Sequence, residues 1–163
     1  MNTDTDRAIL LSIDLNFAQD ILNGIKRWEY RKTPPKLDKE TIMVLYASKD
    51  MHAIIGDCIV TKVLQEPLDT LVEHTIKETT STKERLQKYF QGLDICSALR
   101  VEEPRKYQKT ISLNELRAKI PGFMPPQSFY YLRRDEPKFN FLFDLIDSRY
   151  KGTENKPKRL KSF

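Results

Sequence analysis

The stretch GIKRWEYR, residues 24–31, decides how the rest of this 163-residue chain is interpreted. Its two aromatic residues alternate with charged ones, a period of two that is typical of a half-buried β-strand. In a regular strand Glu29 and Arg31 share one face, and Lys26 joins them if the strand begins irregularly or with a bulge. Gly24 allows a tight turn just before it. The stretch therefore predicts a Lys–Glu–Arg cluster beside a chain reversal.

Such a cluster has two interpretations. In the functional one, Lys26 and Arg31 hold a phosphate or a carbonyl group, and Glu29 accepts a proton or a base N–H. In the structural one, the three side chains form a cross-strand salt-bridge cluster above a core of Trp28 and Tyr30. These two aromatic residues can also stack on a base, although their alternation with charge favours a core position.

On both sides of this stretch the pattern predicts short strands and helices. Apolar runs predict strands at 8–13, 27–32, 41–47, 53–64, 95–101 and 107–111. Helical spacing predicts helices at 15–22, 112–119 and 139–150, with two more between 67 and 91, the second opened by Ser81 and Glu84 as a capping box. The segment PGFMPPQSFYYL, residues 121–132, is expected to form a proline-rich corner. This order, without regular βαβ alternation, favours an α+β fold with a small mixed or barrel-like sheet.

Length and charge indicate a single domain, expected over residues 1–150, and a basic tail. The tail, residues 151–163, holds five Lys or Arg against one Glu, hence +4, and is expected to be disordered. The whole chain carries +5, which leaves +1 for the rest. Within that rest, residues 24–39 hold six basic residues against two acidic ones. Positive charge concentrated in this way suits an anionic partner such as a nucleic acid.

Several classes of protein are disfavoured. No apolar run is long enough to span a membrane, and the first residues lack the basic segment of a secretory signal, so a cytoplasmic location is expected. Cys58 and Cys96 are expected to be reduced core residues. With His52 and His74 they lack the spacing of a zinc site, so no metal is expected. No glycine-rich phosphate loop or nucleophile elbow is present in the sequence, and no cofactor is expected.

The motif G-x-K-x-x-E-x-R, placed after a strand and a helix, resembles that of the ASCH domain, a member of the PUA-like superfold. Its fixed positions here are Gly24, Lys26, Glu29 and Arg31. Further landmarks agree in order: ILLSIDLNFAQDILNG, IMVLYAS, AIIGDCIV and a late PPQSF. The resemblance covers about residues 8–132. It implies a small mixed β-barrel with flanking helices and a cleft lined by the motif's Lys, Glu and Arg. The segment 67–91 and a C-terminal helix at about 137–150 depart from this pattern and are expected to extend beyond the minimal barrel.

The resemblance also implies the partner. The cleft is expected to bind RNA or a modified nucleoside, with DNA as a further option, through the four motif residues. Tyr46 and Ser48, at the end of the strand 41–47, are candidates for the cleft mouth, although they also fit an ordinary strand end. Gln127 and Ser128 in PPQSF can offer amide and hydroxyl groups to a base edge, or can cap the element that follows.

Two other functions stay open. Some ASCH members are enzymes, a ribonuclease and an amidohydrolase of acetylated cytidine, which suggests a metal-independent hydrolase with Glu29 as general base, Lys26 stabilising the developing anion and Arg31 orienting the substrate. The amidohydrolase motif carries Thr at the position of Glu29, which argues against deacetylation. The third hypothesis is a protein-interaction module that uses the C-terminal helix, although packing of that helix within the chain is favoured.

Overall fold

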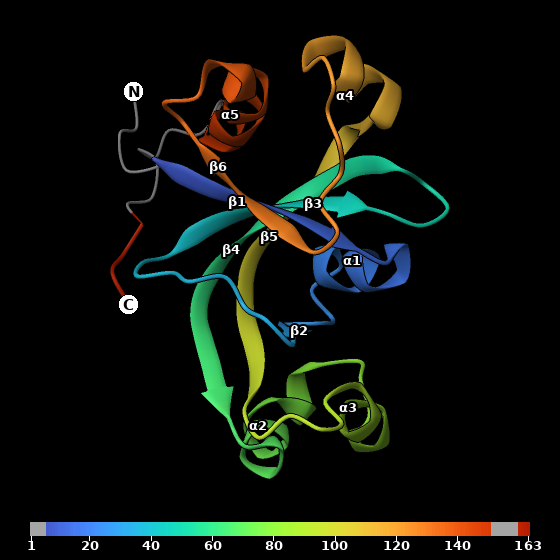
Figure 1. The fold of residues 1–163 in the computed structure, drawn as a ribbon, viewed down its shortest axis with the longest axis vertical. Helices are drawn as coiled ribbons and strands as arrows, with labels where there is room; N and C mark the ends of the chain where they lie inside the picture. The colour runs from blue at the N-terminus through green and yellow to red at the C-terminus, as the bar shows by residue number, and fades with distance from the viewer. Residues whose placement is uncertain (1–5, 151–159) are drawn as a thin grey trace.

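A six-stranded mixed sheet forms the centre of the computed structural model, which describes residues 6–150 and 160–163 (Figure 1). Its strands are β1 (Arg7–Ile13), β2 (Trp28–Arg31), β3 (Thr41–Ala47), β4 (Ala53–Glu66), β5 (Cys96–Ser112) and β6 (Phe129–Arg133). They are ordered β2-β5-β4-β3-β1-β6. β1 and β3 run parallel, and the other neighbouring pairs are antiparallel. The α+β class predicted from the sequence is confirmed.

The sheet is curved but not closed, which corrects the expectation of a barrel. β2 and β6 stand at its two edges, and no strand pairing joins them in the described part of the chain. Register shifts between β4 and β5 bend the long central strands, because each bulge adds local twist. A side chain crosses the open seam instead: Arg31 of β2 donates to the Ser12 carbonyl of β1 at 2.9 Å and to the Ser128 hydroxyl at 3.4 Å.

Helices cover both ends of the sheet. They are α1 (Leu15–Leu22), α2 (Leu68–Thr75), η1 (Ile76–Glu78), α3 (Lys83–Tyr89), α4 (Leu113–Lys119), η2 (Pro137–Phe139), α5 (Asn140–Asp147) and η3 (Ser148–Tyr150). Figure 1 shows α2 and α3 together at one end of the β4–β5 ribbon, and α4 and α5 at the opposite end of the molecule. None of the helices in the described ranges is long and apolar enough to cross a membrane.

Alternating side chains divide the core. In β1, Ala8 and Leu10 belong to the cluster under α4 and α5, whereas Ile9 and Leu11 belong to the cluster under α1. A third cluster places the buried Trp28 and Tyr30 against residues of α2 and α3, so the core position favoured for both aromatic residues is confirmed. α5 buries its apolar face, Leu142, Phe143 and Ile146, in the first cluster, which is packing within the chain.

Three local predictions were wrong. The strands expected at 95–101 and 107–111 form one continuous strand, β5. Pro104 lies in a β-bulge, where two residues of β5 stand opposite the single residue Cys58 of β4. A proline is tolerated at a bulge because no N–H is needed there for strand pairing. The proline-rich corner ends in β6, which pairs with β1. The cap of α3 is Thr82, whose hydroxyl accepts from the Arg85 amide at 3.2 Å, and not Ser81.

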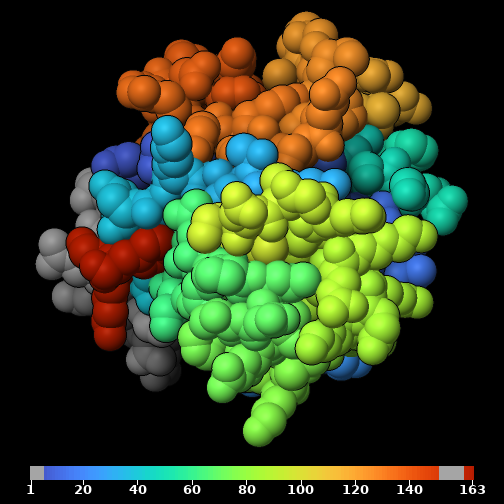
Figure 2. Space-filling model, turned by 60° about the horizontal axis from the view of Figure 1, so that its bottom comes forward, coloured from blue at the N-terminus to red at the C-terminus, as the bar shows by residue number. Residues whose placement is uncertain are grey.

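The end of the chain returns to the sheet region. Residues 151–159 of the expected tail lie outside the described residues. Leu160 is buried in the core, and Ser162 forms a bridge with Lys39, where the sequence predicted disorder. Backbone hydrogen bonds also join this segment to Asp38 and Glu40. Figure 2 shows it on the surface beside the connection between β2 and β3.

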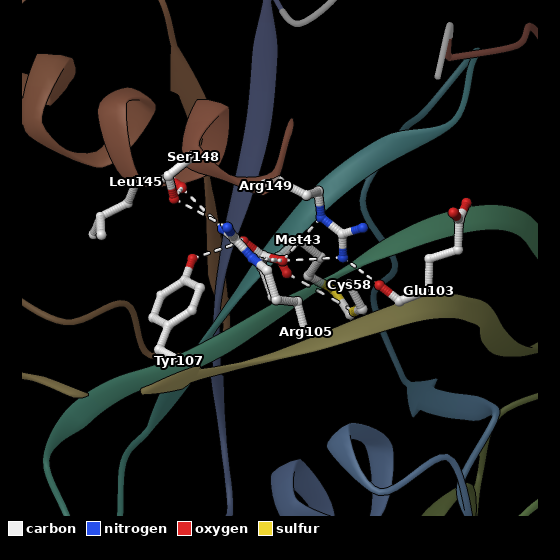
Figure 3. A network of polar contacts seen from close by, with 9 residues as sticks. Met43, Cys58, Glu103, Arg105, Tyr107, Leu145, Ser148 and Arg149 are labelled. Carbon is white, nitrogen blue, oxygen red and sulfur yellow. Dashed lines mark hydrogen bonds and ion pairs between the residues drawn. The ribbon is translucent and has the colours of Figure 1, made fainter. Parts of the chain in front are cut away.

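A buried ionic network fastens the last helical turn to the sheet (Figure 3). Asp57 of β4 is fully buried. Its carboxylate accepts from Arg105 at 2.6 Å, from Arg149 of η3 at 3.1 Å and from the Tyr107 hydroxyl at 2.7 Å. Arg105 also donates to the Leu145 carbonyl at 2.8 Å. The network therefore links β4 and β5 to α5 and η3, and no sequence pattern indicated it.

Candidate functional site

The turn after α1 positions the first residue of the motif. Gly24 has a φ of +77°, a left-handed conformation that glycine adopts without strain. The backbone amides of Ile25 and Lys26 both donate to the Asp20 carbonyl at 3.0 Å. β2 begins only at Trp28. Because the chain enters the strand irregularly, Lys26 is not bound by strand alternation and turns toward Glu29.

Lys26, Glu29 and Arg31 form one ion cluster, called here the Glu29 cluster. Oε1 of Glu29 lies 3.5 Å from the Lys26 ammonium. Oε2 accepts from both Nε and Nη2 of Arg31, at 3.0 and 2.7 Å. Lys26 is 2% exposed and Glu29 4%, so these two side chains are almost fully removed from solvent, whereas Arg31 is partly exposed. A single carboxylate thus balances two cations, which leaves positive charge for an anionic or carbonyl ligand.

Arg31 donates its hydrogen bonds to groups of the protein itself. Besides Glu29, its guanidinium binds Ser12 and Ser128 across the seam of the sheet. A guanidinium held on several acceptors has a fixed orientation. Arg31 is therefore placed to hold the Glu29 carboxylate and the two sides of the seam in position.

The Lys26 ammonium has N–H donors beyond the one directed to Glu29. Its ammonium lies above the rings of Phe17 and Tyr30, at 5.1 and 4.9 Å from their centres. Within the described ranges, Glu29 is the one carboxylate within ion-pair distance of it. Burial lowers the pKa of Lys26 and the neighbouring Glu29 opposes that shift. Because an ammonium has three N–H donors, the Lys26 amine retains capacity to bind a ligand.

A cleft of about 550 Å³ opens above this cluster. That volume lies in the range of small-molecule sites. Its walls come from β1 and α1, from the end of β3, from α3 and from the segment before β6. The lining residues are Ser12, Ile13, Asp14, Phe17, Lys26, Glu29, Tyr30, Arg31, Ser48, Lys49, Ser81, Arg85, Leu86, Tyr89, Pro126 and Gln127. In the described residues, no group of three or more His, Cys, Asp or Glu side chains is placed to hold a metal ion.

Not every residue predicted for the site reaches the cleft. Ser48 and Gln127 line it with the charged motif residues, and Ser128 contacts Arg31. Gly24 shapes the turn and borders a separate, smaller depression. Tyr46 is buried in the core cluster of α4 and α5, because the side chains of β3 alternate and that face points into the core.

Two helices of the site, α1 and α3, were not indicated by any sequence motif. Phe17 comes from α1, and Ser81, Arg85 and Tyr89 come from α3 and the residues before it. Arg85 and Tyr89 are four residues apart on α3, a spacing that places them on one helix face, and Ser81 stands just before the helix begins. The spacing of Arg85 and Tyr89 was the available signal, but the segment 67–91 was expected only to extend beyond the minimal barrel.

Known proteins share this fold. The family model of the ASCH domain matches residues 11–110. A curated "ASCH domain-containing ribonuclease" from Zymomonas mobilis is 28% identical over 129 residues, which cover 78% of this chain and 85% of that protein. The crystal structure of ASCH from Zymomonas mobilis has a TM-score of 0.77 at 24% identity and covers 85% of this chain and 94% of its own. The N-terminal domain of Staphylothermus marinus McrB has a TM-score of 0.51 at 15% identity, covering 87% of this chain and 93% of its own.

Proposed function

The chain belongs to the ASCH domain family, and from that premise we propose that it binds single-stranded RNA, with one unpaired nucleoside unit in the cleft above Lys26. One observation carries the proposal. The buried Lys26 ammonium lies at the floor of a ligand-sized cleft with N–H donors available, and aromatic rings line the walls. The similarity to a ribonuclease supports RNA as the ligand class.

The charge around the cleft supports an anionic ligand. The lining residues include the cations Lys26, Arg31, Lys49 and Arg85 against the acids Asp14 and Glu29. This excess of positive charge attracts a phosphate backbone and makes the affinity depend on salt, because bound counterions are released from the nucleic acid.

The shape of the cleft supports an unpaired base. Phe17 and Tyr89 line it and are 36% and 39% exposed, so both offer ring surface for stacking. Gln127 and Ser48 offer an amide and a hydroxyl for a base edge. A base inside a duplex cannot enter such a concave site without leaving its partner, whereas a base in a single strand is free to do so.

Binding of a short labelled single-stranded RNA, followed by fluorescence anisotropy, tests this proposal. Lys26→Met removes the ammonium and keeps much of the side-chain volume. Loss of one charged hydrogen bond, about 1.5–3 kcal/mol, lowers the affinity about tenfold or more. Lys62→Met is the matched control, because Lys62 is exposed on β4 and lies outside the cleft. Equal affinities of wild type and Lys26→Met would contradict the assignment of this cleft, and duplex RNA and single-stranded DNA serve as competitors that define the ligand.

RNA hydrolysis is the second candidate, and the ribonuclease relative favours it. In this reaction Glu29 takes the proton of the hydroxyl that attacks the phosphorus, and the bond from phosphorus to the 5′-oxygen breaks as the new P–O bond forms. The departing oxygen takes a proton from water, and the Lys26 ammonium stabilises the negative charge that develops at the phosphate. Oε1 is the oxygen suited to this step, since Oε2 accepts from Arg31 twice. Arg31 acts as a positioning residue.

A cleavage assay separates the two candidates. Labelled RNA is incubated with wild type and with Glu29→Gln in the presence of EDTA. Product formed by the wild type and lost in Glu29→Gln supports a metal-independent hydrolase. Binding without product, in both proteins, supports a reader of RNA.

A further inference from the structure

One charged side chain of the cleft is not explained by the Glu29 cluster. Lys26 and Arg31 are paired with Glu29, and Lys49 lies 3.5 Å from Asp14. Arg85 is exposed, and within residues 6–150 and 160–163 it has no carboxylate at ion-pair distance. The cleft therefore presents one guanidinium whose donors are available to a ligand.

The helix that carries Arg85 is fixed against the site. α3 packs Leu86 into the cluster that also buries Tyr30 of β2. Tyr89 donates its hydroxyl to the Tyr30 carbonyl at 3.5 Å, and Lys32 lies over the Tyr89 ring at 5.0 Å. These contacts hold α3 as one wall of the cleft, so Arg85 stands at a defined place on its rim.

The spacing on α3 matches a base and its phosphate. Arg85 and Tyr89 are four residues apart, hence about 6 Å along the helix axis and on the same face. Ser81, which stands just before α3 begins, also lines the cleft. A ring that stacks on a base thus stands one helical turn from a guanidinium, whose planar fork suits the paired oxygens of a phosphate.

We propose that Arg85 forms a phosphate subsite at the rim of the cleft, which binds the phosphate of a nucleotide whose base lies against Tyr89. The subsite makes the cleft select nucleotides and RNA over free nucleosides. It rests on the proposed function, since it takes the base-binding cleft as given, and it assigns to α3 a role that the motif residues do not supply.

The salt dependence of RNA binding tests the subsite. Affinity for a short labelled single-stranded RNA is measured over a salt series for wild type, Arg85→Gln, Lys88→Gln and Lys26→Met. Lys88 is the matched control, because it is an exposed cation on the same helix outside the cleft. Loss of one phosphate contact lowers the slope of log affinity against log salt by about 0.7 in Arg85→Gln. Lys88→Gln keeps the wild-type slope.

Competition with cytidine and cytidine monophosphate gives a second readout. The wild type prefers the monophosphate, and Arg85→Gln loses that preference while it still binds cytidine. An unchanged slope and preference in Arg85→Gln, together with weak RNA binding by Lys26→Met, overturns the subsite and leaves the proposed function standing. An equal fall of slope in Lys88→Gln overturns it as well, because the effect then belongs to the general charge of α3. No RNA binding by the wild type overturns both proposals.

Discussion

Two buried carboxylates in this molecule each lie between two cations, and only one of them faces a cleft. Glu29 is bound by Lys26 and Arg31, and Asp57 by Arg105 and Arg149. The shortest ion pairs are similar, 2.7 Å at Glu29 and 2.6 Å at Asp57. Charge and distance alone therefore do not distinguish the two clusters.

The two clusters differ in whether the N–H donors of their cations are already bonded to protein groups. In the Asp57 cluster, which comprises Asp57, Arg105, Tyr107 and Arg149, the guanidiniums also donate to protein groups such as the Leu145 carbonyl and the Ser148 hydroxyl (Figure 3). In the Glu29 cluster, the Lys26 ammonium meets one carboxylate, two aromatic rings and the cleft. The Asp57 cluster stabilises the fold, because its hydrogen-bond donors bond to several other segments of the chain. The Glu29 cluster is suited to a ligand, because N–H donors of Lys26 remain available at the cleft.

The largest effect is expected from Asp57→Asn. The substitution removes the negative charge that compensates Arg105 and Arg149 in the protein interior. It is therefore expected to lower the free energy of unfolding by about 3–5 kcal/mol. Urea unfolding followed by circular dichroism measures the loss. RNA affinity of the folded variant is expected to equal that of the wild type. A loss below about 1 kcal/mol would show that the Asp57 cluster does not fasten the C-terminal helices.

Glu29→Gln is the matched change in the other cluster and is expected to cost less. The glutamine keeps one carbonyl acceptor, and Arg31 retains Ser12 and Ser128, so the loss is about 1–3 kcal/mol. The same unfolding experiment measures it. If Glu29→Gln destabilised the protein as much as Asp57→Asn, the contrast between a ligand-facing and a structural cluster would fail.

Lys26→Met is expected to change the stability by about 1 kcal/mol or less, because the lost ion pair is offset by the removal of a desolvated charge. The proposed RNA binding is expected to weaken about tenfold or more in this variant. Arg149→Met serves as the counterpart with the opposite result: lower stability and unchanged RNA affinity. Paired unfolding and anisotropy measurements on both variants check this, and similar profiles for the two would contradict the comparison.

The smallest effect is a pH dependence. Burial lowers the pKa of Lys26 from its ordinary 10.5, so between the lowered value and 10.5 the unfolded chain binds more protons than the folded one. Stability contributed through Lys26 therefore rises with pH across that window, and RNA affinity falls as the ammonium loses its charge. The difference in unfolding free energy between wild type and Lys26→Met, measured over this window, gives the sign. A flat difference would mean that Lys26 is not desolvated.

The Glu29 cluster was within reach of sequence reasoning because its members lie within six positions. Alternation in β2 and the turn at Gly24 are local effects that residue types dictate. By contrast, β6 was missed because its place in the sheet comes from pairing with β1, more than a hundred residues earlier. The closed barrel was predicted wrongly for a related reason. Closure depends on whether the two edge strands of the sheet, here β2 and β6, pair with each other, and no local pattern determines that.

The amino-acid sequence by itself determined the elements whose cause is local: strands with alternating side chains and the reversal at Gly24. Only the tertiary structure decided which of two carboxylate clusters faces a cavity. Arg149 reaches Asp57 from 92 positions away, and α3 brings Arg85 to the rim above Lys26. Such contacts follow from how the whole core packs, and no local periodicity encodes them.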